Sequence, residues 1–205
     1  MVYSITLMRH AESVGNAEGY YQGQSDFPLT QRGEEQAKSL AARWLKEGKT
    51  FQRVISSPLS RARGTAEILG QALNLSVEYD PLWMERDNGE LAGLRPEEAA
   101  LRHPRPAFIH PYQPIGDTGE SQWELYLRAG RAVQNLLCRP PDHYLVVSHG
   151  GILNMVLYAI LGIVPQANFQ GARFRFRNTA FATLTYSPKE HSWVLEGLND
   201  RMHWG

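Results

Sequence analysis

Short apolar runs alternate with longer segments of helical spacing along the first part of the chain. Residues 2–8 are apolar and partly β-branched, which predicts a buried strand. Residues 31–47 place apolar or small side chains at helical intervals, with Thr30 as the N-cap and Gly48 closing the helix. The other elements predicted in this half are a strand at 54–57, a helix at 60–73 and a strand at 75–79.

Residues 86–118 interrupt this alternation. Their periodicity is weak, and five prolines fall within 19 residues, which is typical of a functional loop or lid inside a compact domain. We expect one short helix within it, at 96–102. Beyond this lid the pattern predicts a helix at 120–138, a strand at 144–148, a buried helix to about Leu161, and strands around Phe174 and Phe176, at 180–186 and at 193–198.

Strands that alternate with helices predict an α/β fold. We expect a three-layer α/β/α sandwich with a mostly parallel central sheet, an antiparallel edge strand and a short lid insertion. The length of 205 residues suits one domain, covering residues 1–205.

The overall charge is balanced, with 21 basic and 21 acidic residues and a pI near 7.1. This argues against nucleic acid or an anionic membrane as a partner. Cys138 is the only cysteine, which excludes an intrachain disulfide framework and a cysteine-based zinc site. Seventeen of the 21 basic residues are arginine, whose planar fork binds carboxylates and phosphates bidentately.

The chain offers no membrane-spanning or targeting pattern. Its longest apolar stretch, Gly151–Val164, is shorter than the roughly 20 residues that a membrane span needs. Residues 1–10 lack the length and the basic start of a signal peptide. We therefore expect a cytoplasmic protein with no membrane partner.

Chemically active side chains follow the predicted strands. The first strand ends in Arg9-His10, Arg61 lies just after the second, and Glu85 follows the third. Residues 148–151, Ser-His-Gly-Gly, join a later strand to a helix N-terminus. Because ligands bind at the carboxyl ends of parallel strands, these residues are expected to meet at one edge of the sheet.

That inventory fits phosphoryl transfer through a phosphohistidine. Arginine forks and the N–H groups of a helix N-terminus bind a phosphate dianion. A histidine can attack phosphorus, and a carboxylic acid can protonate the departing alkoxide. Each residue alone is more often a solvated surface group, so the prediction depends on their convergence.

The same residues carry a resemblance that runs nearly from end to end. The sequence resembles the histidine phosphatase superfamily, the phosphoglycerate-mutase-like enzymes, and within it the small phosphatases. The matching segments are Leu7–Asn16, Gln22-Gly23, Asp26–Thr30, Gly33, Gln36-Ala37, Ser56–Ala62, Thr65–Glu67, Glu85 with Gly89, Gly119–Ser121, Val147–Gly151 and Leu198–Asp200 with His203.

The resemblance implies a role for each matching position. His10 is the residue that becomes phosphorylated, and Glu85 is the general acid and then the base that activates water. Three further residues bind the phosphoryl group: Arg9, Arg61 and a protonated His149. The remaining phosphate- or substrate-binding positions are Asn16, Gln22, Gly23 and the N–H of Gly150. No metal and no cofactor are implied, because the two arginines and a protonated histidine can neutralise the phosphate.

Two positions depart from the family pattern. Ala11 stands where glycine is usual, and we expect its methyl to be tolerated, although it narrows the pocket floor. Ala92 stands where the family often has glutamate, which removes a supporting carboxylate but not the acid. Asp87 and Glu90 compete with Glu85 for the acid role, and we favour Glu85.

Within this chemistry we favour a phosphatase acting on a small-molecule phosphate ester. Only 63 residues separate Glu85 from His149, a short insertion for this family, and in this the chain resembles the small phosphatases, which let water in. A cofactor-dependent phosphoglycerate mutase is the alternative within the family, and a catalytically silent binding or regulatory protein is the alternative outside it. A metal-dependent hydrolase is disfavoured, because the other histidines lack ligand spacing; one of these, His203, is a candidate lock for the C-terminus.

The substrate and the oligomeric state stay open. Cationic lid residues favour an acidic ester such as phosphoglycerate or phosphoserine, or they form a solvated surface. Tyr20 and Tyr21 favour a bulkier ester, such as a sugar phosphate or ribazole phosphate. A homodimer is neither required nor excluded. The cationic and aromatic lid residues concerned are Arg95, Arg102, His103, Arg105, Phe108, His110 and Tyr112.

Overall fold

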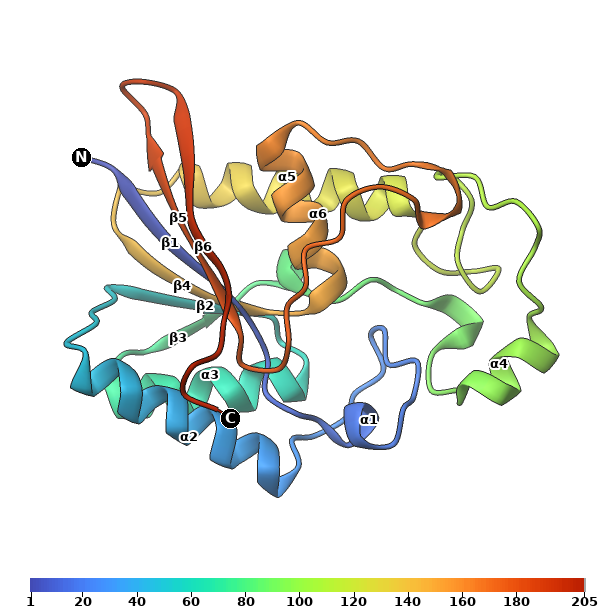
Figure 1. The fold of residues 1–205 in the computed structure, drawn as a ribbon, viewed down its shortest axis with the longest axis horizontal. Coiled ribbons are helices and arrows are strands. Elements are labelled where there is room, and N and C mark those ends of the chain that lie inside the picture. Colours follow the sequence, from blue (N-terminus) through green and yellow to red (C-terminus); the bar gives the residue numbers. More distant parts are fainter. Residues whose placement is uncertain (205) are drawn as a thin grey trace.

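The computed structural model describes residues 1–204, which form six strands and six α-helices (Figure 1). In chain order they are β1 (Tyr3–Arg9), α1 (Val14–Ala17), α2 (Gln31–Lys46), β2 (Arg53–Ser56), α3 (Ser60–Leu73), β3 (Val77–Tyr79), α4 (Pro96–Arg102), α5 (Gln122–Leu137), β4 (His143–Ser148), α6 (Gly150–Leu161), β5 (Phe181–Ser187) and β6 (Ser192–Asp200). The Thr30 hydroxyl accepts a hydrogen bond from the Gly33 N–H, as expected of the N-cap of α2.

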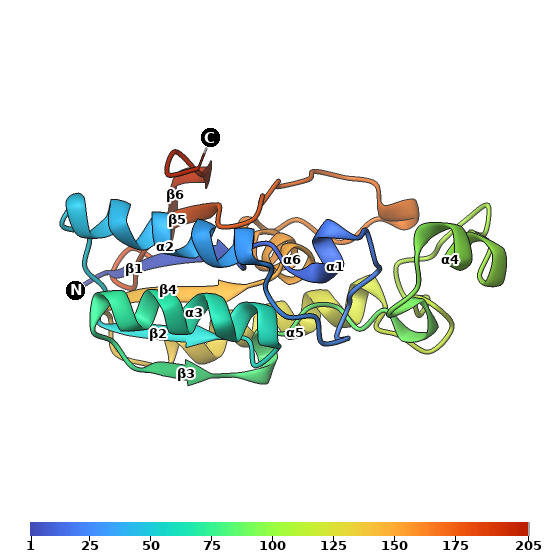
Figure 2. The ribbon, with the colours of Figure 1, turned by 90° about the horizontal axis from the view of Figure 1, so that it is seen from below.

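All six strands form one sheet in the order β3-β2-β4-β1-β5-β6. The first four are parallel, whereas β5 pairs antiparallel with β1 and β6 pairs antiparallel with β5. The predicted α/β sandwich, with a mostly parallel sheet and antiparallel pairing at its edge, is confirmed. Helices α2 and α3 cover one face of the sheet, and α5 and α6 cover the other (Figures 1 and 2).

Each face of the sheet has its own apolar core because side chains alternate along a strand. On β1, Leu7 packs in the cluster that includes α5 and α6, whereas its neighbour Met8 packs in the cluster that includes α2 and α3. Val146 and Val147 of β4 divide in the same way. Since these strands are buried on both faces, they carry continuous apolar runs instead of alternating ones.

The strand predicted around Phe174 and Phe176 is wrong. Residues 163–180 are irregular apart from a short 3-10 turn at Ala167–Phe169. Side chains take the place of a strand ladder here: Asn154 bonds both the N–H and the carbonyl of Phe174, at 2.8 and 2.7 Å, and Arg9 donates to the carbonyl of Phe176 at 2.9 Å. The ring of Phe176 is nevertheless buried, as expected of a core residue.

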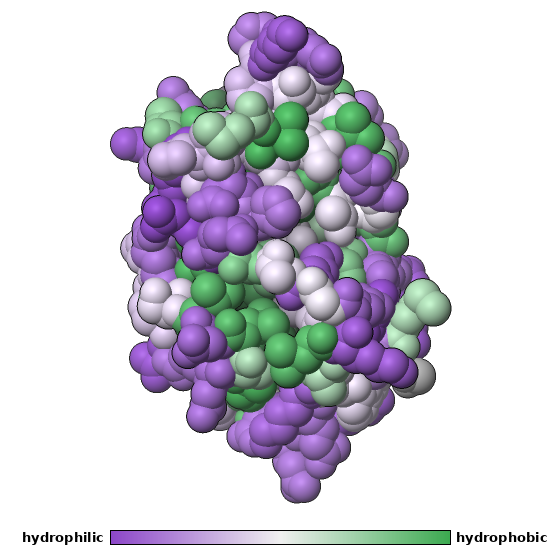
Figure 3. Space-filling model, turned by 90° about the vertical axis from the view of Figure 1, so that its left-hand side faces the viewer, coloured by the Kyte–Doolittle hydropathy of each residue, from purple (hydrophilic) through white to green (hydrophobic). Residues whose placement is uncertain are grey.

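The lid extends beyond the carboxyl ends of the strands, at the right of Figure 1. Its only α-helix within the described residues is α4, at the predicted bounds. The opposite end of the molecule carries mostly hydrophilic side chains around a smaller apolar area (Figure 3). Among residues 1–204 no helix combines the length and the apolar character that crossing a membrane requires.

The C-terminal segment packs against α2 and against Thr179, which in turn bonds the end of β1. The imidazole of His203 lies 2.9 Å from the Thr179 hydroxyl, and the His203 carbonyl accepts a hydrogen bond from Ser39 of α2. Thr179 has a left-handed backbone (φ 57°), and its N–H donates to the carbonyl of Arg9 at 3.2 Å. The predicted locking role of His203 therefore fits contacts that reach the end of β1.

Gly33, in the first turn of α2, lies against the backbone of Glu12 in the loop that follows His10. A Cβ at position 33 would overlap the Glu12 carbonyl oxygen, whereas the helical Gly130 has no atom near its missing Cβ. We predict that Gly33→Ala destabilises the protein by about 2 kcal/mol, because the backbone contact cannot relax as a flexible side chain would. Gly130→Ala, the matched control, should be neutral or slightly stabilising in urea unfolding. Equal midpoints for the two variants would contradict this packing.

Candidate active site

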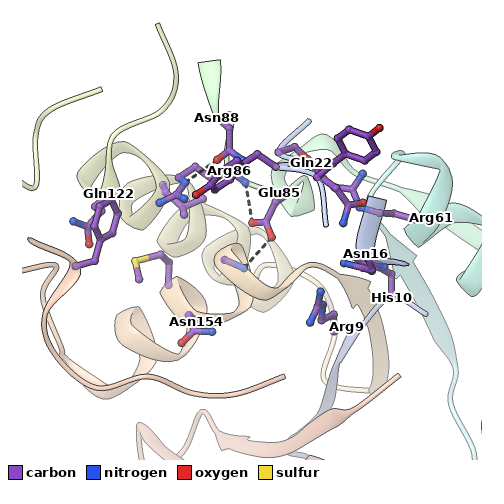
Figure 4. A pocket seen from close by; sticks show the side chains of 17 residues that line it. Arg9, His10, Asn16, Gln22, Arg61, Glu85, Arg86, Asn88, Gln122 and Asn154 are labelled. Atoms are coloured by element: carbon purple, nitrogen blue, oxygen red, sulfur yellow. Dashed lines mark hydrogen bonds between the residues drawn. The ribbon is translucent and has the colours of Figure 1, made fainter. Parts of the chain in front are cut away.

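A cavity of about 380 Å³ opens at the carboxyl ends of the central strands (Figure 4). Seven of the nine predicted site residues line it: Arg9, His10, Asn16, Gln22, Gly23, Arg61 and Glu85. The other two do not. His149 is fully buried beside His10, and Gly150 lines a neighbouring hollow.

His10 is buried, and one of its ring nitrogens is engaged. The Nδ1 atom lies 2.6 Å from the carbonyl oxygen of Ala11, so Nδ1 carries the proton and donates it. The lone pair of the neutral ring is therefore on Nε2. Burial, followed by the charges of Arg9 and Arg61, lowers the pKa of His10 well below its usual value, which keeps the ring neutral.

Ala11 contributes through its backbone. Its side chain is buried and does not line the cavity, so the expected narrowing of the pocket floor is not seen. Its N–H donates to the Thr65 hydroxyl at 3.0 Å, while its carbonyl accepts from His10. A methyl group in place of hydrogen at this position is compatible with both contacts.

Arg9 and Arg61 bring two positive charges to the cavity without a carboxylate partner among residues 1–204. Arg9 donates to the carbonyl of Phe176, and Arg61 donates to the carbonyls of Gly23 and Ser25 at 2.6 and 2.9 Å. Burial lowers the pKa of both, that of Arg61 to about 10. The buried Nε–H groups of both arginines have no partner within the described chain, which suits an incoming anion.

His149 lies directly behind His10, with ring centroids 5.0 Å apart. Its Nε2 is 2.7 Å from the Ser57 hydroxyl, and its buried Nδ1 has no partner among the described residues. Burial, and then the charge of Arg61, lowers the pKa of His149 well below its usual value. This direction favours a neutral ring in the free site, and the protonated His149 expected with a bound phosphate stays a prediction.

Glu85 is held at the N-terminus of α6. Its carboxylate accepts the N–H groups of Gly151, Ile152 and Arg86 at 2.9, 3.1 and 2.9 Å (dashed in part in Figure 4). Such N–H groups and the helix dipole stabilise a carboxylate. The competing acids Asp87 and Glu90 do not line the cavity.

Arg128, which was not among the predicted site residues, holds the backbone around Glu85 in place and is itself paired with Glu120. Arg128 of α5 donates to the carbonyls of Leu82, Met84 and Glu85, at 2.9, 2.7 and 3.1 Å. The same guanidinium pairs with Glu120 at 2.7 Å. No local spacing signals such a contact, because it joins segments more than 40 residues apart.

The amide residues form a network around the entrance loop. Asn16 accepts a hydrogen bond from Asn178, which also donates to the His10 carbonyl at 3.1 Å. Gln22 accepts from Ser13 at 2.7 Å. Gly23 adopts φ 51°, and its carbonyl accepts from Arg61, so it acts on the site by orienting that guanidinium.

Several lining residues were not predicted. They come from the lid, α5, α6 and the irregular segment 163–180, and they are Arg86, Asn88, Gln122, Leu125, Asn154, Met155 and Phe169. Only Asn154 carried a signal, as a polar interruption of the most apolar helix. Within the described residues, one His-carboxylate cluster has the spacing of a metal site: Glu90, His103 and Asp117, in the lid and outside this cavity.

Comparison with known proteins shows the family to which this sequence and fold belong. Residues 5–201 match the histidine phosphatase superfamily (branch 1). A probable phosphoglycerate mutase, GpmB, of Yersinia enterocolitica is 35% identical over 97% of this chain and 94% of its own length. The alpha-ribazole phosphatase of Shigella flexneri superposes with a TM-score of 0.81 at 25% identity, covering 97% of this chain and 96% of its own. A mycobacterial glucosyl-3-phosphoglycerate phosphatase complexed with VO3 superposes with a TM-score of 0.77 at 27% identity, covering 96% and 98%.

The chain therefore belongs to the histidine phosphatase superfamily, and it is an enzyme of the histidine phosphatase type. The family resemblance of its sequence motifs is confirmed.

Gly151 allows Glu85 to approach α6, because a Cβ at position 151 would overlap a Glu85 carboxylate oxygen. We predict that Gly151→Ala lowers kcat/KM for phosphate esters at least tenfold by displacing this carboxylate. Alanine otherwise favours a helix, so the free energy of unfolding should change little. Gly130→Ala is again the control and should retain activity. A fully active Gly151→Ala enzyme would show that the position of Glu85 is not important.

Proposed function

We propose that the protein is a metal-independent phosphomonoesterase that hydrolyses small-molecule phosphate esters in the cytoplasm through a phosphohistidine on His10. The arrangement around His10 supports this proposal most directly. Its Nδ1–H is engaged by the Ala11 carbonyl, so Nε2 is the nitrogen available for attack. Two guanidinium groups without carboxylate partners line the same cavity and suit a phosphoryl group.

In the first step, Nε2 of His10 attacks phosphorus as the ester oxygen departs. Arg9 and Arg61 neutralise the equatorial oxygens, where charge accumulates. The buried Nδ1 of His149, which has no partner among the described residues, is the group proposed to bind a further oxygen, because the phosphate charge favours its protonation. Glu85, in its protonated form, gives its proton to the leaving alkoxide.

In the second step, water attacks the phosphohistidine. The Glu85 carboxylate accepts a proton from water as the new P–O bond forms and the N–P bond breaks. The three backbone N–H groups that hold Glu85 orient one carboxyl group for both steps. His10 returns to its neutral form, and inorganic phosphate leaves.

Hydrolysis is favoured over mutase chemistry by access for water. A mutase must keep water from its phosphoenzyme, whereas here the reaction cavity adjoins a second cavity under the lid and shares residues with it. The name of the Yersinia relative makes a phosphoglycerate mutase the second candidate. Both share the phosphohistidine and differ in whether water or a second alcohol accepts the phosphoryl group.

Replacing the nucleophile tests the central step. We predict that His10→Ala abolishes hydrolysis of p-nitrophenyl phosphate and the acid-labile phosphoenzyme, because no other described side chain offers a free nucleophile at this position.

EDTA should leave the wild-type rate unchanged, since the arginines supply the positive charge. Retained turnover in His10→Ala, or a marked loss with EDTA, would contradict the mechanism. A parallel assay for interconversion of phosphoglycerates separates phosphatase from mutase.

Changing the leaving group tests Glu85. Glu85→Gln removes the proton donor, so esters with poor leaving groups should slow by roughly 100-fold, within the usual range of general acid catalysis. p-Nitrophenyl phosphate needs little protonation and should slow much less. The ratio of the two kcat/KM values, measured in wild type and variant, isolates the first step, because hydrolysis of the shared phosphoenzyme does not enter kcat/KM. Equal slowing of both substrates would show that Glu85 is not the acid.

A further inference from the structure

Gln36 is a buried polar residue that the proposed mechanism does not use. It lies on α2, outside the lining of the reaction cavity, and is 5% exposed. Its side chain accepts a hydrogen bond from the backbone N–H of Glu12 at 2.9 Å. Because that N–H can only donate, the Gln36 atom that receives it is the amide oxygen. The contact joins α2 to the loop that follows the nucleophile, two residues beyond His10.

The peptide group that Gln36 bonds also carries the acceptor for the His10 ring. The peptide between Ala11 and Glu12 is planar, with the Ala11 carbonyl on one side and the Glu12 N–H on the other. The carbonyl oxygen lies 2.6 Å from Nδ1 of His10. A chain of hydrogen bonds therefore runs from the His10 ring through this peptide to the Gln36 amide. Hydrogen bonds in such a chain polarise one another, which makes the carbonyl a stronger acceptor.

Other residues hold the neighbouring peptides of this loop. The Thr65 hydroxyl accepts the N–H of Ala11 at 3.0 Å, which orients the preceding peptide. The N–H of Thr30 donates to the Glu12 carbonyl at 3.0 Å, which orients the following one. Within residues 1–204, the peptide between Ala11 and Glu12 bonds only to His10 and Gln36. The direction of the Ala11 carbonyl therefore depends on Gln36.

The start of α2 is built to allow this contact. Gly33 and Gln36 are three residues apart, so they share one face of the helix. Gly33 lacks the Cβ that would overlap the Glu12 carbonyl oxygen. The helix can therefore approach Glu12 closely enough for the Gln36 side chain to reach its N–H.

The direction of the Ala11 carbonyl decides which ring nitrogen of His10 carries the proton. A carbonyl accepts and cannot donate, so it holds the proton on Nδ1 and leaves the lone pair on Nε2. If the carbonyl turned away, a proton on Nε2 would remove the lone pair that attacks phosphorus. We propose that Gln36 is a positioning residue that keeps His10 in its nucleophilic tautomer by orienting the peptide between Ala11 and Glu12. The catalytic consequence rests on the function proposed above, whereas the structural relation does not.

Gln36→Met tests this inference, because it nearly keeps the size of the side chain and removes the acceptor. Long-range ¹H–¹⁵N NMR spectra distinguish the two tautomers of a neutral histidine, and His10→Ala identifies the signals of His10. The wild type should show the Nδ1–H tautomer. In Gln36→Met the buried Glu12 N–H loses its partner and the peptide turns, so the Nδ1–H tautomer should fall to roughly a tenth of the population.

Kinetics of the same variant should separate attack on phosphorus from binding of phosphate. The kcat/KM for p-nitrophenyl phosphate should fall roughly tenfold, in step with the population of the nucleophilic tautomer. The inhibition constant of inorganic phosphate should rise no more than about twofold, because Arg9 and Arg61 still bind it and an Nε2–H can donate to one of its oxygens.

Two further variants serve as controls. Gln36→Glu keeps an acceptor oxygen and should therefore keep the Nδ1–H tautomer. Gln31→Met changes an exposed glutamine of the same helix whose amide bonds Glu35, and it should keep the tautomer, with kcat/KM within about twofold. A merely structural role for Gln36 would lower the unfolding midpoint of Gln36→Met without changing the tautomer, and that result overturns the inference.

The wild type alone already puts the inference at risk, since a proton on Nε2 of His10 would overturn it whatever the variants do. A changed tautomer in Gln36→Met with an unchanged kcat/KM would overturn it as well. If Gln36→Met does not fold, Gln36→Ala removes the same acceptor with the residue that a helix accommodates best, and the same results are expected.

Failure of the proposed function has a different signature. If the wild type forms no phosphoenzyme, or if His10→Ala retains turnover, the phosphohistidine mechanism is wrong. The NMR comparison needs no substrate, so it still decides whether Gln36 orients the Ala11 carbonyl. Conversely, a phosphoenzyme in the wild type together with an unchanged tautomer in Gln36→Met overturns the inference and leaves the phosphatase function intact.

Discussion

The parallel pairing of β1 with β4 is the constraint on which the rest of the site depends. Arg9 lies opposite Ser148 in this register, and the N–H of His10 donates to the Ser148 carbonyl at 2.9 Å. The residues that follow the two strands, His10 and His149, are thereby brought ring to ring. A slip of one residue would turn the side chains of a strand to the opposite face, so the two apolar cores also determine which side chains reach the cavity.

The electrostatics of the site follow from burying cations without their counter-ions. Three guanidinium groups line one cavity, and backbone carbonyls or side-chain oxygens, not carboxylates, hold them. Burial, and then the charges of Arg9 and Arg61, lower the pKa values of His10 and His149, which favours neutral imidazoles. A neutral imidazole is what a nucleophile requires, so one arrangement both prepares the attacking nitrogen and favours a dianion. Since both histidines must gain a proton on unfolding in acid, they lower stability as the pH falls below their unfolded values near 6.5.

Much of the fold could be predicted from periodicity because the elements concerned are buried and regular. The bounds of α3 and α4 agree with the prediction, and those of β1 and α2 differ by one residue. The segment around Phe174 failed because its backbone bonds are made by Asn154 and Arg9, distant in sequence, which no local pattern reveals. The alternation of phenylalanine and arginine there shows that the extended segment has one buried side and one exposed side. It forms no strand because no neighbouring strand pairs with its backbone.

The candidate site was predictable where residues follow strands and less so elsewhere. Arg9, His10 and Glu85 meet because topology brings strand ends together. Gly150 was assigned to the cavity from its place in the motif, but it lines the adjoining hollow. Arg86 and Phe169 are 83 residues apart and meet only through the packing of the lid, so their stacking depends on tertiary structure.

The irregular segment 163–180 connects the two ends of the site. Near its start Asn168 exchanges two hydrogen bonds with the backbone of Ile109 in the lid, and near its end Asn178 bonds the carbonyl of His10. Irregular surface segments usually tolerate insertions and deletions. This segment is anchored at both ends and along its length. We therefore expect it to tolerate insertions and deletions as poorly as a strand does. Length variation within the protein is therefore better accommodated at the tip of the β5–β6 hairpin, which lies away from the lid (Figure 1).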